Sequence, residues 1–147
     1  MTTRRALIVR GGWDGHVPVD ATNLFIPFLE AQGFQVDVTD TLDTYLDQDR
    51  LHTTDLIVQC WSIGTITDDQ AKGLEAAVKA GTGLAGWHGG IVGAFHHNRY
   101  QRLTGGQFVW HPDEFVDHTL TIIPDRAQHE IVSGIDSVEL HTEKNTG

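Results

Sequence analysis

Short apolar segments that alternate with helical patterns are the feature that most constrains this chain. Residues 6–9 and 55–60 are nearly continuous apolar runs, residues 83–86 have a similar character, and a glycine- and tryptophan-containing loop follows each. Continuous apolar runs are typical of strands that are buried on both faces of a parallel sheet. Parallel strands need crossover connections, which are usually helices. The order of elements therefore predicts a three-layer α/β sandwich with a mostly parallel sheet.

Patterns between these runs give the other expected elements. Apolar spacing predicts a helix over residues 23–32, in which Pro27 requires either a start near Asn23 or a kink in a longer helix from Pro18. Thr67 and Gln70 form a capping-box signature for a helix that ends at Ala80. Strands are also predicted at 34–39 and 115–123, and residues 138–140 begin another. A helix is predicted at 95–103, and a polar loop at 40–54 with one helical turn at 42–46.

Length and composition favour one ordinary globular domain. The chain has 147 residues, of which 39% are hydrophobic and 20% are charged, so extensive disorder is not expected. No internal repeat or low-complexity linker divides it, and we predict a single domain over residues 1–147.

The charge balance excludes two classes of partner. Twenty acidic residues against ten basic ones give a formal net charge of -10, which repels nucleic acid and anionic membrane surfaces. No apolar run approaches the ~20 residues of a membrane-spanning helix, and the only cysteine, Cys60, cannot form an internal disulfide. We expect a cytoplasmic protein in which Cys60 is a core thiol rather than a nucleophile.

One sequence motif is misleading. Residues 81–86 spell the dinucleotide-binding pattern G-x-G-x-x-G. That pattern binds phosphates where a strand ends and a helix begins, whereas here the glycines end a helix and enter a strand. We therefore expect no nucleotide cofactor.

Tryptophan and histidine recur in the loops after the predicted strands and in a similar segment at 105–112. Open α/β sheets bind ligands at the carboxyl ends of their strands. An indole ring suits stacking on a sugar, and imidazole can transfer protons or bind a metal near neutral pH. For any single tryptophan, the alternative is a ring that completes the core. The pairs are Trp13 with His16, Trp87 with His88 and Trp110 with His111, while Trp61 lies in a further loop.

His88 has the strongest claim to a catalytic role. The expected strand, the glycine-flanked turn at 86–90 and a following helix match the nucleophile elbow, which presents one side chain above the sheet. The turn contains neither serine nor cysteine, so acyl transfer through a covalent intermediate is disfavoured. General acid/base catalysis and metal ligation remain as roles for His88. A His₃ zinc site built from His16, His88 and His111 is one such alternative.

At these same residues the chain resembles the ThuA-like, or trehalose utilisation, family. The resemblance covers nearly the whole chain and rests on a combination of short motifs. They are Gly11-Gly-Trp-x-Gly-His16, Trp61-x-x-Gly-Thr-Ile-Thr67, Gly83-Leu-Ala-Gly-Trp-His-Gly-Gly90, Tyr100-Gln and Gly105-Gly-Gln-Phe-x-x-His-Pro112.

The resemblance implies a flavodoxin-like fold, similar to that of class I glutamine amidotransferases, in which His88 replaces the amidotransferase cysteine. It implies a role in the catabolism of trehalose or related disaccharides, including keto-sugars made by a partner sugar dehydrogenase. By position, His88 and His111 are the expected catalytic residues. The expected substrate-binding residues are Trp13, His16, Trp61, Trp87 and Gln107.

Two functional hypotheses follow. The first is an enzyme in which histidines move protons during hydrolysis or isomerisation of a sugar. The second is a non-catalytic domain that binds a sugar or another small ligand on an amidotransferase-like scaffold. Family members extend further than this chain, so either it is a short variant or part of the domain is missing. A missing strand would expose a sheet edge, and on that ground we expect a homo-oligomer.

Overall fold

The computed structural model describes residues 3–110 and 115–143. It divides between Phe108 and Val109 into two compact units. Each unit is described by itself, and a single domain over residues 1–147 stays a prediction.

The first unit contains a four-stranded parallel sheet. Its strands are β1 (Arg4–Gly12), β2 (Phe34–Thr39), β3 (Leu56–Ser62) and β4 (Gly83–Gly86). They are hydrogen-bonded in the order β2-β1-β3-β4. This order corresponds to the first four strands of the flavodoxin-like order 2-1-3-4-5. The predicted parallel α/β fold is therefore confirmed.

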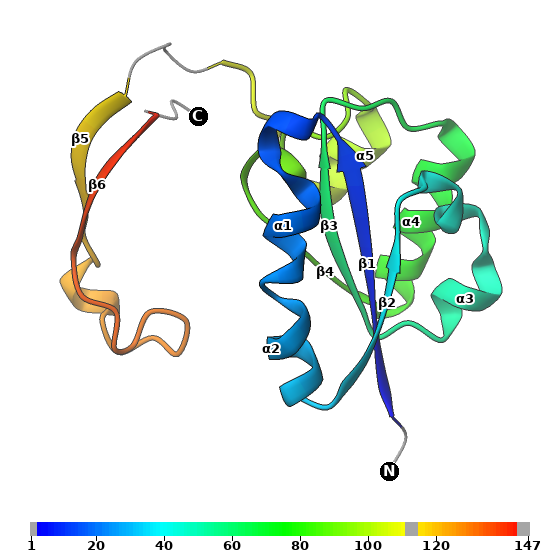
Figure 1. The fold of residues 1–147 in the computed structure, drawn as a ribbon, viewed down its shortest axis with the longest axis horizontal. Coiled ribbons are helices and arrows are strands. Elements are labelled where there is room, and N and C mark those ends of the chain that lie inside the picture. Colours follow the sequence, from blue (N-terminus) through cyan, green and yellow to red (C-terminus); the bar gives the residue numbers. More distant parts are fainter. Residues whose placement is uncertain (1–2, 111–114, 144–147) are drawn as a thin grey trace. The chain divides into compact units, whose positions relative to one another are not determined.

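Helices cover both faces of this sheet and give the three layers. One face carries α1 (Pro18–Asn23) and α2 (Ile26–Ala31), and the other carries α3 (Gln48–His52), α4 (Asp68–Ala80) and α5 (Asn98–Thr104). Figure 1 shows α1 and α2 on one side of the strands and α4 on the other.

The two faces explain why the first apolar run does not alternate. Leu7 and Val9 pack into the core under α3, α4 and α5, whereas Ala6 and Ile8 pack into the core under α1 and α2. All four side chains are fully buried. A strand between two helical layers needs apolar residues at every position, and the sequence pattern reports this directly.

Several predicted boundaries hold. Thr67 and Gln70 form the expected capping box at the start of α4, with the Gln70 amide N–H 3.2 Å from the Thr67 hydroxyl. The chain from Pro18 forms two helices broken before Pro27, which is the kinked alternative. The helical turn expected at 42–46 is the 3-10 helix η2 (Leu42–Leu46).

Two helical predictions were wrong in detail. The loop expected over residues 40–54 contains α3, whose first turn begins where the Asp47 carboxylate accepts the Arg50 amide N–H. The helix expected at 95–103 begins at Asn98, because Phe95 forms a parallel bridge with Gly64 and is held extended by it.

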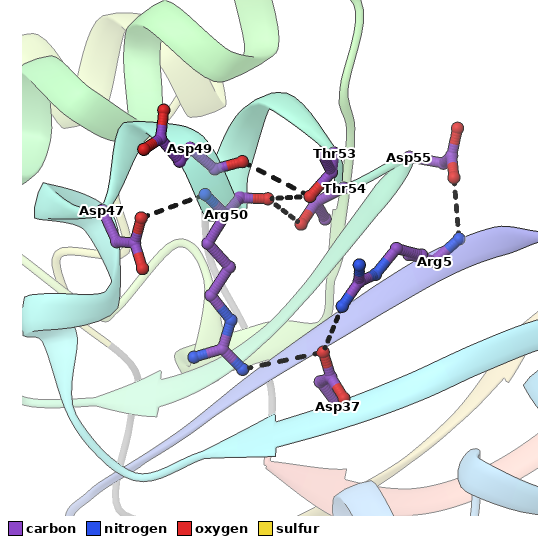
Figure 2. A network of polar contacts seen from close by, with 8 residues as sticks. All are labelled: Arg5, Asp37, Asp47, Asp49, Arg50, Thr53, Thr54 and Asp55. Carbon is purple, nitrogen blue, oxygen red and sulfur yellow. Dashed lines mark hydrogen bonds and ion pairs between the residues drawn. The ribbon is translucent and has the colours of Figure 1, made fainter.

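A polar network closes the amino-terminal edge of the sheet (Figure 2). Asp37 of β2 accepts a hydrogen bond from Arg5 of β1 at 3.3 Å and pairs with Arg50 of α3 at 3.9 Å. The Arg5 backbone N–H donates to the Asp55 carboxylate at 2.7 Å. These groups are partly exposed, so each ion pair is worth at most about 1 kcal/mol. The network lies at the opposite edge from the carboxyl ends of the strands, where ligands bind.

The second unit contains an antiparallel pair, β5 (Phe115–Leu120) and β6 (Val138–Glu143). The strand predicted over 115–123 ends at Leu120 rather than Ile123. After three further residues, Pro124 opens the 3-10 helix η4 (Pro124–Arg126), and proline cannot donate a ladder hydrogen bond.

Candidate functional site

His88 stands on a sharp turn at the carboxyl end of β4. Trp87 is still extended, and His88 then takes a φ of 45° at the start of the 3-10 helix η3 (His88–Gly90). A left-handed non-glycine residue costs about 1–2 kcal/mol and is typical of functional sites. The predicted elbow is therefore present, although a single helical turn follows it. Backbone N–H groups of Ile91 and Val92 both bind the His88 carbonyl, at 3.1 and 3.0 Å.

His16 is brought to the same edge by the loop after β1. Gly12 has a φ of 82°, and its α-carbon lies so close to the Ser62 backbone that a Cβ there would overlap it. The Trp13 amide N–H donates to the Ser62 carbonyl at 3.0 Å. The chain then forms the 3-10 helix η1 (Asp14–His16). His16 Nδ1 lies 2.7 Å from the Ser62 hydroxyl, which is itself buried at the end of β3.

Four rings gather at this point, and we call them the ring cluster. It consists of Trp13, His16, His88 and Phe108. The ring centroids of His16 and His88 are 5.2 Å apart, those of Trp13 and His16 are 4.8 Å apart, and those of His88 and Phe108 are 5.9 Å apart. Phe108 is held beside the elbow by its amide N–H, which donates to the Val92 carbonyl at 2.8 Å.

The ring cluster is open to solvent on one side. Trp13 is 52% exposed, His88 is exposed and His16 is half-buried. The two imidazoles approach closely because Gly89 has no side chain, since a Cβ there would lie 2.5 Å from His16 Cε1. An accessible pair of imidazoles beside an indole face is suited to proton transfer on a bound sugar.

Ser62 is a functional candidate that the sequence analysis did not find. Its hydroxyl is hydrogen-bonded to His16 Nδ1 and fixes the orientation of that ring. A hydrogen bond to one ring nitrogen commonly orients a catalytic histidine so that its other nitrogen can react. The sequence offered one signal, since Ser62 follows Trp61 at the end of a predicted strand. Its meaning depends on the β1–β3 register, which pairs Gly12 with Ser62.

The structure places Trp61 and Trp87 in packing positions. Trp61 lies over Gly11 and against Gly64, and it packs on the core beneath α4. Trp87 packs against Phe25 with ring centroids 4.7 Å apart, on the face covered by α1 and α2. These contacts agree with the core-completing alternative, and a role in substrate binding stays a prediction for both rings.

The Gln107 side chain is hydrogen-bonded to His96 and Gln101 rather than to the ring cluster. Its Nε2 lies 2.5 Å from His96 Nδ1, and its Oε1 accepts a hydrogen bond from Gln101 of α5. The next residue, Phe108, reaches His88. The predicted binding residue thus lies beside the site along the chain, while its side chain is hydrogen-bonded to α5.

His111 lies outside the described residues, and so does any zinc site that includes it. Within the described part of the chain, no three His, Cys, Asp or Glu side chains are placed to hold a metal ion. The His₃ zinc alternative stays a prediction.

Cys60 agrees with the expected core thiol. It is 2% exposed, and burial raises the pKa of its thiol above the ordinary value. The protonated form therefore dominates near neutral pH, which disfavours nucleophilic attack by this residue.

The fold and the site together define a flavodoxin-like α/β protein with a histidine at the elbow after β4. The model of the ThuA family, described as trehalose utilisation, matches residues 5–145. The chain therefore belongs to the ThuA trehalose utilisation family, as the sequence motifs indicated.

A solved structure has a similar fold. It is a ThuA-like protein from Bacteroides uniformis ATCC 8492, which aligns with a TM-score of 0.71 at 19% identity over 95% of this chain. This chain spans 59% of that protein's length. No curated protein matches the chain. In residues 3–110 and 115–143, no helix has the length and apolar character needed to cross a membrane.

Proposed function

We propose that this chain acts on trehalose or a related disaccharide, including a keto-sugar, by histidine-mediated acid/base hydrolysis or isomerisation. The observation that carries the proposal is the pair of imidazoles, His16 and His88, with ring centroids 5.2 Å apart at the carboxyl ends of the strands. Membership of the trehalose utilisation family supports the substrate class. A dehydrogenase would be the class of enzyme that supplies a keto-sugar.

The two histidines have complementary roles in this proposal. We assign one ring the role of general acid and the other that of general base. The Ser62 hydroxyl is bonded to Nδ1 of His16, and we assign proton transfer by His16 to Nε2. In hydrolysis, an imidazolium gives its proton to the leaving glycosidic oxygen while an imidazole takes one from the attacking water. In isomerisation of a keto-sugar, the base removes a proton from the carbon beside the carbonyl while the acid protonates the carbonyl oxygen, which gives an enediol. The first ring then returns its proton to the former carbonyl carbon, and the second ring takes the proton of the other hydroxyl, so that a new carbonyl forms there.

The same geometry argues against amidotransferase activity. A glutamine amidotransferase needs a thiolate at the elbow, and this chain has His88 there. The only cysteine, Cys60, is buried in the core.

A second candidate is a sugar-binding domain without catalysis. It is favoured by Trp13, whose ring is 52% exposed beside His16 and offers a flat face for a pyranose. Both candidates predict sugar binding, and only the enzyme predicts turnover.

The test compares wild type with His88→Ala and with His52→Ala, which removes an exposed histidine on α3 as a matched control. Trehalose and its keto derivative are incubated with each protein, and products are followed by proton NMR while binding is measured by calorimetry. Turnover that His88→Ala abolishes and His52→Ala preserves, with binding intact, supports the enzyme. Binding without turnover by wild type supports the second candidate. Absence of both binding and turnover contradicts the proposed function.

A further inference from the structure

Three polar side chains are buried beneath the His88 elbow. Tyr45, Gln59 and Tyr100 are 0%, 0% and 2% exposed, and Gln59 stands in β3 between the apolar Val58 and Cys60. A buried amide is costly unless its hydrogen bonds are satisfied. An apolar residue would fill this strand position at lower cost, so the contacts made by Gln59 need an explanation.

These side chains are connected by a continuous series of hydrogen bonds, which ends at two backbone carbonyls of the elbow. The Tyr45 hydroxyl donates to Gln59 Oε1 at 2.9 Å. Gln59 Nε2 donates to the Gly90 carbonyl at 3.2 Å and to the Tyr100 hydroxyl at 2.5 Å. The Tyr100 hydroxyl donates to the Ile91 carbonyl at 2.7 Å. Both donors and the acceptor of the Gln59 amide are therefore used.

Burial keeps both phenols in the donating state. It raises the pKa of Tyr45, with a further contribution from Tyr100, and it also raises the pKa of Tyr100. Both hydroxyls thus remain protonated, and able to donate, over the whole neutral range.

We propose that Gln59 and Tyr100 are positioning residues that hold the His88 elbow in its left-handed conformation. They bind the carbonyls of Gly90 and Ile91, the second and third residues after His88 along the turn. A non-glycine residue with positive φ persists only where its surroundings over-determine it. The two side chains supply this constraint from β3 and α5, and they thereby set the distance between the His88 and His16 rings. The catalytic consequence rests on the proposed function, whereas the geometric one does not.

The chain of hydrogen bonds provides its own matched pair of variants. Tyr100→Phe removes the hydroxyl that binds the Ile91 carbonyl, whereas Tyr45→Phe removes an equally buried hydroxyl and leaves both elbow carbonyls bonded. A merely structural network predicts similar effects of the two variants on the elbow. A positioning network predicts an effect of Tyr100→Phe alone.

Two NMR readouts report on the elbow without a substrate. One is the nuclear Overhauser effect between the His16 and His88 rings, and the other is hydrogen exchange of the Ile91 and Val92 amides, which bind the His88 carbonyl. In Tyr100→Phe, we expect the ring contact to weaken and amide exchange to accelerate about tenfold, the effect of one lost buried hydrogen bond. In Tyr45→Phe, both readouts should match wild type. If a substrate is identified, Tyr100→Phe should lower kcat with little change in KM.

The proposal is overturned if folded Tyr100→Phe leaves both readouts unchanged, or if Tyr45→Phe alters them equally. If Tyr100→Phe does not fold, hydrogen exchange in wild type decides. The Gln59 side-chain amide should then be protected as strongly as the Ile91 backbone amide, and rapid exchange of Gln59 would contradict the proposal. Absence of turnover in wild type would contradict the enzymatic function but not the positioning role, because the NMR readouts do not require turnover.

Discussion

Replacement of Gly89 by alanine tests the geometry of the site most directly. A Cβ at this position would lie 2.5 Å from His16 Cε1 and 3.0 Å from Nδ1. Ordinary van der Waals contact begins at 3.4 Å, so the His16 ring must move by about 0.9 Å. The ring is half-buried and can swing toward solvent, but this movement pulls Nδ1 away from the Ser62 hydroxyl.

The expected cost in stability comes mainly from Ser62. A buried hydroxyl that loses its partner costs about 1–3 kcal/mol, and the lower chain entropy of alanine offsets about 0.4–1 kcal/mol of this. We therefore expect Gly89→Ala to lower the free energy of unfolding by about 1–2 kcal/mol, as measured by urea denaturation. Any turnover should fall about 100-fold, because a displacement near 1 Å of a reacting group is costly.

Gly106→Ala is the matched control. An added Cβ at Gly106 meets no atom within 4 Å, so the free energy of unfolding of this variant should lie within about 0.5 kcal/mol of the wild-type value. If Gly89→Ala were as stable as Gly106→Ala and kept the His16–His88 ring contact, the close approach of the two loops would be refuted.

Three further outcomes are expected. Ser62→Ala should lower the free energy of unfolding by about 1–2 kcal/mol, because the hydrogen bond between the Ser62 hydroxyl and His16 Nδ1 is lost. An unchanged urea denaturation curve would show that this hydrogen bond is not made. Hydrogen bonds from Lys79 and, to a smaller extent, from Arg99 lower the pKa of Glu75 below its ordinary value of 4.5. The stability that this carboxylate contributes is therefore complete above pH 4.5 and is lost as the pH falls through the lowered pKa. Glu75→Gln should accordingly be less stable than wild type near neutral pH and converge with it in acid, and a constant difference across the titration would contradict the pairing. The buried Cys60 thiol should resist iodoacetamide in the folded protein and react in strong urea, whereas rapid alkylation of the native protein would show that it is accessible.

Local signals were sufficient for most of the first unit. The apolar run at 6–9 identified β1, because a strand covered on both faces admits no polar alternation. The Thr67 and Gln70 pair marked the start of α4, because a capping box is formed by neighbouring residues alone. The polar segment that contains α3 has the capping residue Asp47 but no capping box, and its helix also depends on the buried Leu51 and on packing against α4.

The candidate site was predicted in part. Its elbow could be recognised at His88, because the glycine-flanked turn after a strand is a local pattern. His16 and Trp13 were also identified, and the structure brings His16 to His88 and Trp13 to His16. The sequence could not show that Trp61 and Trp87 differ from Trp13 in packing against the core. A tryptophan that follows a strand gives the same sequence pattern whether its ring packs on the sheet or faces solvent.

The sequence by itself determined the parallel α/β class, the position of the elbow and the family, since each depends on residues that are adjacent or regularly spaced. Tertiary structure alone decided which side chains meet. Ser62 reaches His16 across 46 positions, and Gln59 reaches Tyr100 across 41, through the pairing of strands and the packing of α5. Such contacts are fixed by the register of β1 on β3 and by the burial of both layers, which no local pattern of residues encodes.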